Sequence, residues 1–263
     1  MDIKQTATLI TNDDGFNSKG IDVLKKISKN LFKNVWIVAP LKNQSAKSHS
    51  ITINKKLKIK KIKLKEYSLS GTPVDCVIIG LYKLISDNKI KPKLLLSGIN
   101  EGINLGLDLL YSGTVAAARE GSINGIKSIA ISVNRNKNKI DYSAVKFFAP
   151  KIIESILKKN IPSNIFYNIN FPSLSCQLVK GIKVVKTGER KPGKLIYSNI
   201  ENKEKNFIIP SERKILSTAK SGEDEFELKR HFITLSIHHN KNLYISERDF
   251  IKYKKILGKI IEQ

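Results

Sequence analysis

Two adjacent carboxylates, Asp13 and Asp14, follow a short apolar run near the start of the 263-residue chain. The run ATLI at 7–10 predicts a buried strand, which places the two side chains in the turn TNDDG at its end. Like charges only a few ångströms apart repel each other, and a bound cation removes that repulsion. The doublet therefore indicates a metal site, although Asp-Asp-Gly taken alone is more typical of an ordinary turn.

Two further polar stretches follow apolar runs. Ser45 lies in NQSA after the predicted strand at 35–40, and Asn100 ends SGIN after the strand at 94–96. Parallel strands place their carboxyl ends at one edge of a sheet, where ligands bind. Carboxylate, hydroxyl and amide oxygens are hard donors that suit Mg²⁺, Mn²⁺ or Ca²⁺. The chain has no Cys/His cluster, so zinc is not expected.

A glycine-rich loop, EGINLG at 101–106, precedes the stretch YSGTVAAAREG at 111–121. Ser112 or Thr114 can cap a helix that has an alanine-rich interior. The start of a helix has free backbone N–H groups and the positive end of the dipole, and both favour phosphate. Alone, this pattern predicts an ordinary capped helix, but beside a metal site it predicts a phosphate cradle.

The elements that carry these side chains alternate between apolar strands and amphipathic helices. Strands are predicted at 7–10, 35–40, 94–96, 129–132 and 166–171, and helices at 21–31, 72–86 and 142–158. Strands that alternate with helices imply right-handed crossovers and a mostly parallel sheet covered on both faces. We therefore expect a Rossmann-like, three-layer αβα fold over residues 1–175.

The C-terminal part of the chain has a different character. Residues 183–240 contain short alternating segments separated by polar stretches, a pattern that predicts an antiparallel extension. A final helix is expected from Ser246, with Phe250, Tyr253, Leu257 and Ile260/Ile261 along one stripe. We expect residues 176–263 to form an extension of a β-hairpin and a helix that is not an independent domain.

The formal net charge of +24 raises the alternative of a nucleic-acid-binding protein. Only six of the 47 basic residues are arginine, however, and the lysines are spread from end to end without interleaved aromatic residues. The stretch KKLKIKKIKLKE at 55–66 predicts a half-exposed strand with a bulge and a solvated lysine face. A track for a polyanion is the alternative.

Other features of the composition predict a cytoplasmic protein. Hydrophobic residues make up 41% of the chain, and no apolar run is long enough for a membrane span. The first residues lack the basic and apolar regions of a signal peptide. Cys76 and Cys176 lie far apart without CxxC spacing, and we expect reduced thiols.

Six motifs occur in order along the chain: TNDDG, NQSAxxHSIT, SGTPVDCV, SGINxGxN, YSGTVAAAREG and NINFP. Together they resemble the survival protein SurE family of metal-dependent nucleotidases. The resemblance implies a Rossmann-like domain, a C-terminal extension that exchanges elements between subunits, and a homodimer or homotetramer. It also implies one divalent cation per subunit, Mg²⁺ or Mn²⁺, and hydrolysis of nucleoside 5′- and 3′-monophosphates. Some members also act on short polyphosphate.

The resemblance assigns roles to individual residues. It implies metal ligation by Asp13, Asp14, Ser45 and Asn100, and phosphate contacts by Asn104, Ser112, Gly113 and Thr114. One departure is Ser48, which occupies the place of the usual glycine before His49.

The mechanism keeps alternatives open. We expect metal-assisted attack of water on phosphate, with an aspartate, Asp14 in preference to Asp13, accepting the proton of the water. His49 either protonates the leaving hydroxyl or pins its loop. The competing functions are a phosphatase for polyphosphate or another phosphorylated metabolite, a structural Ca²⁺ site, and nucleic-acid binding. Neither a membrane nor a specific nucleic acid is an expected partner.

Overall fold

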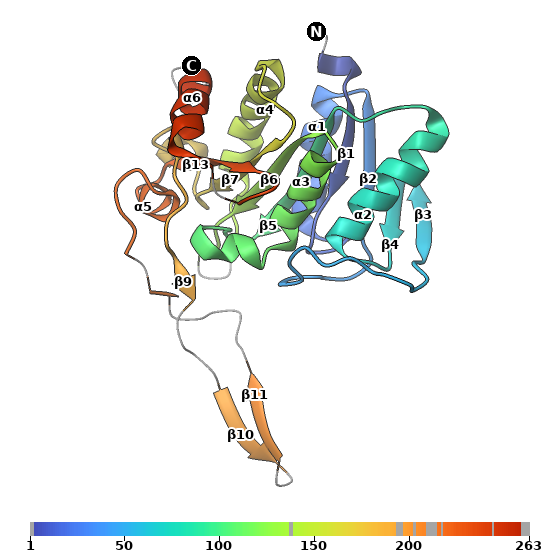
Figure 1. Ribbon diagram of the computed structural model, residues 1–263, viewed down its shortest axis with the longest axis horizontal. Coiled ribbons are helices and arrows are strands. Elements are labelled where there is room, and N and C mark those ends of the chain that lie inside the picture. The colour runs from blue at the N-terminus through green and yellow to red at the C-terminus, as the bar shows by residue number, and fades with distance from the viewer. Residues whose placement is uncertain are drawn as a thin grey trace.

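A nine-stranded sheet forms the centre of the protein (Figure 1). The computed structural model describes residues 3–136, 139–192, 197–201, 204–208, 215–216, 218–243 and 245–258. The strand order in the sheet is β3-β4-β2-β1-β5-β6-β7-β13-β8. The strands are β1 (Ala7–Thr11), β2 (Asn34–Pro40), β3 (Ile59–Lys63), β4 (Glu66–Leu69), β5 (Leu94–Glu101), β6 (Lys127–Val133), β7 (Ile165–Phe171), β8 (Ile182–Val185) and β13 (Ile233–His239).

Most strand pairs in the sheet are parallel, which confirms the expected α/β fold. The pairs β4-β2, β2-β1, β1-β5, β5-β6, β6-β7 and β13-β8 are parallel. Only β3-β4 and β7-β13 are antiparallel within this sheet. Helical crossovers between parallel strands bring both faces of the sheet under cover.

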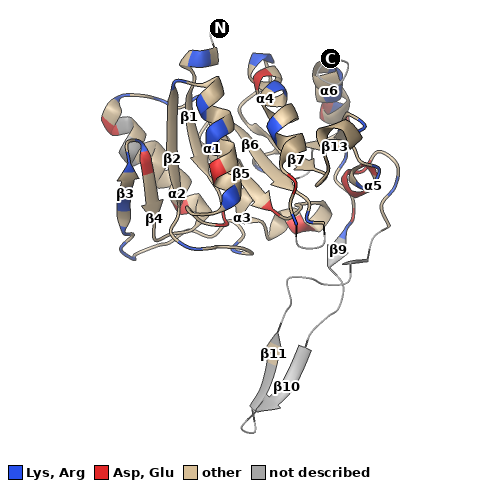
Figure 2. Ribbon diagram, turned by 180° about the vertical axis from the view of Figure 1, so that it is seen from behind, with Lys and Arg blue, Asp and Glu red and all other residues tan. Residues whose placement is uncertain are grey.

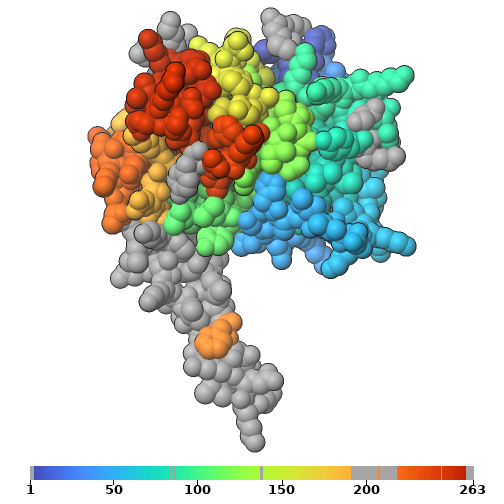
Figure 3. Space-filling model, viewed as in Figure 1, coloured from blue at the N-terminus to red at the C-terminus, as the bar shows by residue number. Residues whose placement is uncertain are grey.

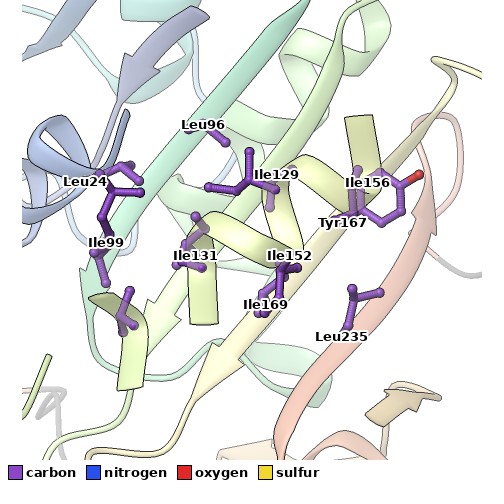
Figure 4. Packing of buried hydrophobic residues seen from close by; sticks show 14 of the residues in the cluster. Leu24, Leu96, Ile99, Ile129, Ile131, Ile152, Ile156, Tyr167, Ile169 and Leu235 are labelled. Atoms are coloured by element: carbon purple, nitrogen blue, oxygen red, sulfur yellow. The ribbon is translucent and has the colours of Figure 1, made fainter. Parts of the chain in front are cut away.

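Helices form a layer on each face of the sheet. The face turned to the viewer in Figure 2 carries α1 (Lys19–Leu31) and α4 (Ser143–Lys158), and α6 (Glu247–Gly258) packs into the same core cluster. Figure 4 shows part of this cluster, to which α4 contributes Ile152 and β7 contributes Ile169. The opposite face carries α2 (Pro73–Ile79) and α3 (Gly113–Ile123). The predicted three-layer arrangement is therefore confirmed.

The helix predicted over 72–86 begins as expected but changes type partway. Thr72 and Asp75 form a capping box, since the Thr72 amide donates to Asp75 Oδ2 at 2.9 Å and the Asp75 amide donates to Thr72 Oγ1 at 3.1 Å. The α-helix ends at Ile79 and continues as a π-helical segment, η2 (Gly80–Ile85), and a 3₁₀ turn, η3 (Ser86–Asn88). The change occurs at Gly80, where a Cβ would lie only 3.0 Å from a methyl group of Leu9.

The lysine-rich segment forms the edge strand β3. Its register against β4 shifts between Lys61 and Lys63, which confirms the predicted irregularity. The prediction of half-exposure was wrong, since all five residues of β3 are exposed. The reason is its position as the outermost strand, where lysines discourage pairing with other chains. β4 was not predicted from the sequence.

The strands after residue 175 form the expected antiparallel extension. β13 continues the main sheet antiparallel to β7, and β8 pairs with β13. β10 (Tyr197–Glu201) and β11 (Glu204–Ile208) form a separate antiparallel hairpin, and β9 (Lys191–Pro192) pairs with β12 (Ile215–Leu216). The boundary at residue 175 stays a prediction.

The final helix agrees with its apolar pattern. Phe250, Tyr253 and Leu257 of α6 are buried, while Ile260 and Ile261 lie outside the described residues.

The segment after β13 lies directly beside α3 (Figure 3), and the Arg119 Nε donates to the Asn240 carbonyl at 2.7 Å. Among the described residues, no helix is both long and apolar enough to cross a membrane.

Candidate functional site

The polar motifs meet where the chain changes direction in the sheet. β1 lies between β2 on one side and β5 on the other. The chain after β1 therefore crosses to one side of β1, and the chain that later enters β5 returns to the other side. Such a switch point opens a crevice outside the carboxyl ends of the strands, which is where open α/β sheets bind ligands. The aspartate doublet follows β1 at this point, and the segments with Ser45 and Asn100 flank it.

Asp13 is buried against the start of α3 and is only 3% exposed. Its Oδ1 accepts a hydrogen bond from the hydroxyl of Thr114. Gly113 packs equally close, because a Cβ at this position would lie 3.0 Å from the Cβ of Asp13. Burial and then the charge of Asp14 raise the pKa of Asp13 to about 6. The start of α3 therefore holds a carboxylate that is costly to ionise without a cation.

Asp14 connects the same turn to the end of β5. Its Oδ2 accepts a hydrogen bond from the backbone N–H of Glu101 at 3.0 Å. Burial raises the pKa of Asp14 as well. The Glu101 carboxylate accepts a bond from the Tyr142 hydroxyl at 2.7 Å. Sequence reasoning missed Glu101 and Tyr142, and only the position of Glu101 directly after SGIN could have signalled its proximity.

The loop that contains Ser45 packs against the aspartate turn. The backbone N–H of Gln44 donates to the Asp13 carbonyl at 2.7 Å. The Asn43 Oδ1 accepts from the Ser45 amide at 2.8 Å, and Ser45 itself is exposed. Gly15 adopts a left-handed φ of 101°, and a Cβ there would lie 3.2 Å from the backbone of residue 42. The turn and the loop therefore need a glycine between them.

Asn100 lies at the end of β5, half-buried, and its Nδ2 donates to the Gly102 carbonyl at 2.7 Å. Its neighbour Glu101 touches Asp14, as described above. Hydrogen bonds thus join the three segments that carry the four expected cation ligands, namely the aspartate turn, the loop with Ser45 and the end of β5. Whether the four side chains share one ion stays a prediction.

The donor set fits a hard divalent cation. Among the described residues, no basic side chain forms an ion pair with Asp13 or Asp14, although Asp13 is buried, Asp14 is half-buried and burial raises the pKa of both. Arg135 lowers the pKa of Asp14, but burial outweighs this effect, and a divalent cation would offset the repulsion between the two neighbouring carboxylates. In the described part of the chain no group of three or more His, Cys, Asp or Glu could hold a metal. A cation held by the two aspartates would therefore need hydroxyl and amide oxygens to complete its site.

The start of α3 is capped by Ser112. Its Oγ accepts from the Val115 amide at 3.1 Å, which settles the choice between Ser112 and Thr114 as the cap. Thr114 directs its hydroxyl to Asp13 instead. The expected phosphate contacts of Ser112, Gly113 and Thr114 stay predictions, and the hydroxyls of the first and last already have partners within the protein.

Asn104 is fixed to the sheet. Its Nδ2 donates to Ser132 Oγ at 2.8 Å, and its amide donates to Asn170 Oδ1 at 2.8 Å. The Nδ2 groups of Asn168 and Asn170 donate to the Asn104 carbonyl at 2.9 and 3.0 Å. These two asparagines come from the NINFP motif on one face of β7. Their spacing of two residues in a strand indicated that both side chains lie on the same face, but the sequence did not identify Asn104 as their partner.

His49 contacts α3 beyond its first turns. Its Nε2 lies 2.9 Å from Glu120 Oε2, and this hydrogen bond lowers the pKa of Glu120. Glu120 follows Gly113 by seven residues, about 10 Å along the helix axis. Ser48, with a φ of 53°, donates its hydroxyl to the Leu110 carbonyl at 2.6 Å. These contacts correspond to the alternative in which His49 pins its loop, and proton donation by His49 stays a prediction.

Comparison with known proteins supports the resemblance noted in the sequence. Residues 8–194 match the family described as Survival protein SurE. The 5′-nucleotidase SurE of Paramagnetospirillum magneticum is 40% identical over 217 residues, which are 82% of this chain and 83% of the relative. The protein of the same name from Wolbachia pipientis subsp. Culex pipiens is 46% identical over 183 residues, 69% of each chain.

A solved structure has the same fold over nearly the whole chain. The crystal structure of the SurE protein from Aquifex aeolicus superposes with a TM-score of 0.77 at 34% sequence identity. The match covers 96% of this chain and 99% of that chain.

Proposed function

This chain belongs to the survival protein SurE family, and on that premise we propose that it is a 5′-nucleotidase, a phosphoric monoester hydrolase. Its proposed substrates are nucleoside 5′- and 3′-monophosphates, hydrolysed with one Mg²⁺ or Mn²⁺ per subunit. The observation that carries the metal proposal is the pair of a buried Asp13 and a half-buried Asp14, neither of which forms an ion pair with a basic side chain among the described residues. The proposed ligands are these two aspartates, Ser45 and Asn100.

The reaction makes a simple electrostatic demand. A phosphomonoester carries close to two negative charges, and two carboxylates would repel it. A bound divalent cation would neutralise this charge and lower the pKa of a bound water. The first turn of α3 adds the positive end of a helix dipole next to Asp13. Gly113 and Thr114 begin this turn, and we propose that it orients the phosphate together with Ser112 and Asn104.

We assign acceptance of the proton from the attacking water to Asp14. Asp13 is nearly fully buried and accepts the Thr114 hydroxyl, whereas Asp14 is partly exposed. The partly exposed carboxylate is the one that an incoming water can reach. The hydrogen bond from the Glu101 amide holds one Asp14 oxygen and so orients the other.

The test is phosphate release from a panel of substrates: nucleoside 5′- and 3′-monophosphates, p-nitrophenyl phosphate and short polyphosphate. Activity is measured after chelation and again after addition of Mg²⁺ or Mn²⁺. We expect chelation to abolish release of phosphate from AMP and the cation to restore it. Asp14→Asn should lower kcat by about 10²-fold or more at saturating metal. The matched control is Asp22→Asn, on the exposed face of α1, which should keep wild-type activity.

Several results would contradict the proposal. Normal turnover of AMP by Asp14→Asn, or activity that survives chelation, would exclude the metal-dependent mechanism. A clear preference for polyphosphate over every nucleotide would favour the second candidate, which the exposed lysine strand β3 supports. An unchanged kcat in His49→Asn would remove His49 from the chemistry.

We also propose a homodimer or homotetramer located in the cytoplasm. Analytical ultracentrifugation would determine the assembly. A steep salt dependence of RNA or DNA affinity would instead favour a nucleic-acid-binding role.

A further inference from the structure

A buried carboxylate from the C-terminal extension holds the glycine-rich loop at 102–110. Asp224 is the first residue of α5 (Asp224–Lys229) and is 1% exposed. Its Oδ2 accepts a hydrogen bond from the backbone N–H of Gly106 at 3.0 Å. Its Oδ1 accepts from the amides of Gly188 at 3.0 Å and of Glu225 at 2.8 Å. One side chain therefore joins the loop after β5 to the chain after β8.

The loop packs so closely against this extension that position 106 has no room for a side chain. Gly106 has a left-handed φ of 53°, and a Cβ there would lie 2.6 Å from the Cβ of Arg190 and 2.9 Å from the carbonyl oxygen of Gly188. The Leu107 amide donates to the Arg190 carbonyl at 3.2 Å. The buried N–H of Gly106 requires an acceptor, and the Asp224 carboxyl oxygen supplies it.

The same loop carries Asn104, two residues before Gly106. Asn104 is bound on its other side to Ser132 and Asn170 of the sheet. The loop then passes through η4 (Gly106–Leu110) directly into Ser112, the cap of α3. The loop is thus clamped between the sheet on one side and the extension on the other.

We propose that Asp224 is a positioning residue for the phosphate-binding loop. Its carboxylate holds Gly106 in place and thereby fixes the loop between Asn104, which the sheet holds, and Ser112 at the start of α3. This inference rests on the proposed function, in which Asn104 and the start of α3 contact phosphate. Loosening the loop removes contacts made with bound substrate and transition state alike, so it raises KM and leaves kcat little changed.

The chain offers a matched control on the same short helix. Glu227 is also 1% exposed and is likewise a buried carboxylate. It pairs with Lys183 Nζ at 2.6 Å and accepts the Gly222 amide at 3.0 Å, and none of its hydrogen bonds among the described residues reaches the loop. A substitution that removes the charge of Glu227 therefore measures the effect of losing a buried carboxylate in α5 while the contact with Gly106 stays intact.

The experiment compares wild type, Asp224→Asn and Glu227→Gln. The asparagine can still accept from Gly188 and Glu225, but its Nδ2 then faces the Gly106 N–H donor to donor. We expect KM for AMP to rise about 10-fold in Asp224→Asn, with kcat within about 3-fold of wild type. Hydrogen–deuterium exchange in a peptide covering 104–108 should accelerate in Asp224→Asn and stay at the wild-type rate in Glu227→Gln.

A second variant approaches the same contact from the loop. Gly106→Ala introduces the close contact with Arg190, so it should displace the loop and raise KM even if Asp224→Asn fails to fold. Unchanged KM in both folded variants, or equal KM changes in Asp224→Asn and Glu227→Gln, would overturn the inference.

The two proposals can fail separately. If the wild type releases no phosphate from any ester, the proposed function fails, and exchange at 104–108 alone decides whether Asp224 holds the loop. If the wild type is active and exchange accelerates in Asp224→Asn while KM stays constant, the positioning role is excluded and the nucleotidase proposal stands.

Discussion

His238 gives the fold a pH-dependent stability that one substitution can isolate. The side chain is 1% exposed on β13, with its ring stacked on Phe166 at 5.2 Å between centroids. Its Nδ1 lies 2.6 Å from the Leu243 carbonyl, which can only accept, so Nδ1 carries the proton. Nε2 therefore accepts from the Ser236 hydroxyl at 2.8 Å. A second proton would turn Nε2 into a donor, so the bond would have to reverse with the Ser236 oxygen accepting, and it would place a positive charge in a buried site.

The size and sign of the effect follow from the pKa. Burial lowers the pKa of His238 from 6.5 to about 4. Between these values the unfolded chain binds the proton and the folded protein does not, so stability falls as the pH falls through this window. The full difference corresponds to about 3 kcal/mol, at about 1.4 kcal/mol per pKa unit. Between pH 7.5 and pH 5.0 the loss of unfolding free energy from this group is about 2 kcal/mol.

Urea unfolding of wild type, His238→Asn and His231→Asn at pH 7.5 and 5.0 measures this contribution. His238→Asn keeps a donor for Leu243 but leaves a cavity, so it should be less stable at both pH values. Its loss of stability between the two pH values should be about 2 kcal/mol smaller than that of wild type. His231→Asn removes an exposed imidazole at a left-handed φ of 70° that asparagine tolerates, and it should follow the wild type. Equal losses in all three proteins would refute the reasoning.

Three other substitutions test contacts at or near the site. Thr114→Val removes the hydroxyl bonded to Asp13, and it should raise the Mn²⁺ concentration for half-maximal AMP hydrolysis by about 10-fold. A change confined to the KM for AMP would instead mean that Thr114 contacts the substrate. Gly113→Ala puts a methyl group 3.0 Å from the Cβ of Asp13, so kcat/KM should fall by about 10-fold or more while the far-UV circular dichroism spectrum stays that of wild type. A wild-type kcat/KM would show that the start of α3 can shift without loss of activity. Asp75→Asn changes a buried carboxylate that accepts hydrogen bonds from the backbone N–H and the hydroxyl of Thr52 at 2.9 and 2.6 Å. Urea unfolding should show a loss of unfolding free energy of about 2–4 kcal/mol. A loss below about 0.5 kcal/mol would mean that Asp75 does not anchor the loop that carries Thr52.

Much of the scaffold follows from local patterns. The apolar runs before Asp13, in 35–40 and in 94–96 are buried strands, because each run has few polar side chains to leave in water. The start of α2 follows from Thr72 and Asp75, whose side chains bond to backbone groups three residues away. Such effects act over a few residues, so they are legible without the rest of the chain.

Other features arise only from packing. No local pattern indicates that the helix after Pro73 widens at Gly80, because that change coincides with the approach of Leu9 from the sheet. β4 is too short and too polar in pattern to stand out, and it forms by pairing with β2. The exposure of β3 depends on its place at the edge of the sheet.

The sequence by itself determined which residue types stand at the ends of the strands, and from them the chemistry of oxygen donors beside a helix start. The tertiary structure alone decided which of them touch. Glu101 meets Asp14 across 87 residues of chain, Asn170 meets Asn104 across 66, and Asp224 meets Gly106 across 118. Contacts at such separations depend on the order of strands in the sheet and on the path of the extension, and neither leaves a periodic trace in the residues themselves.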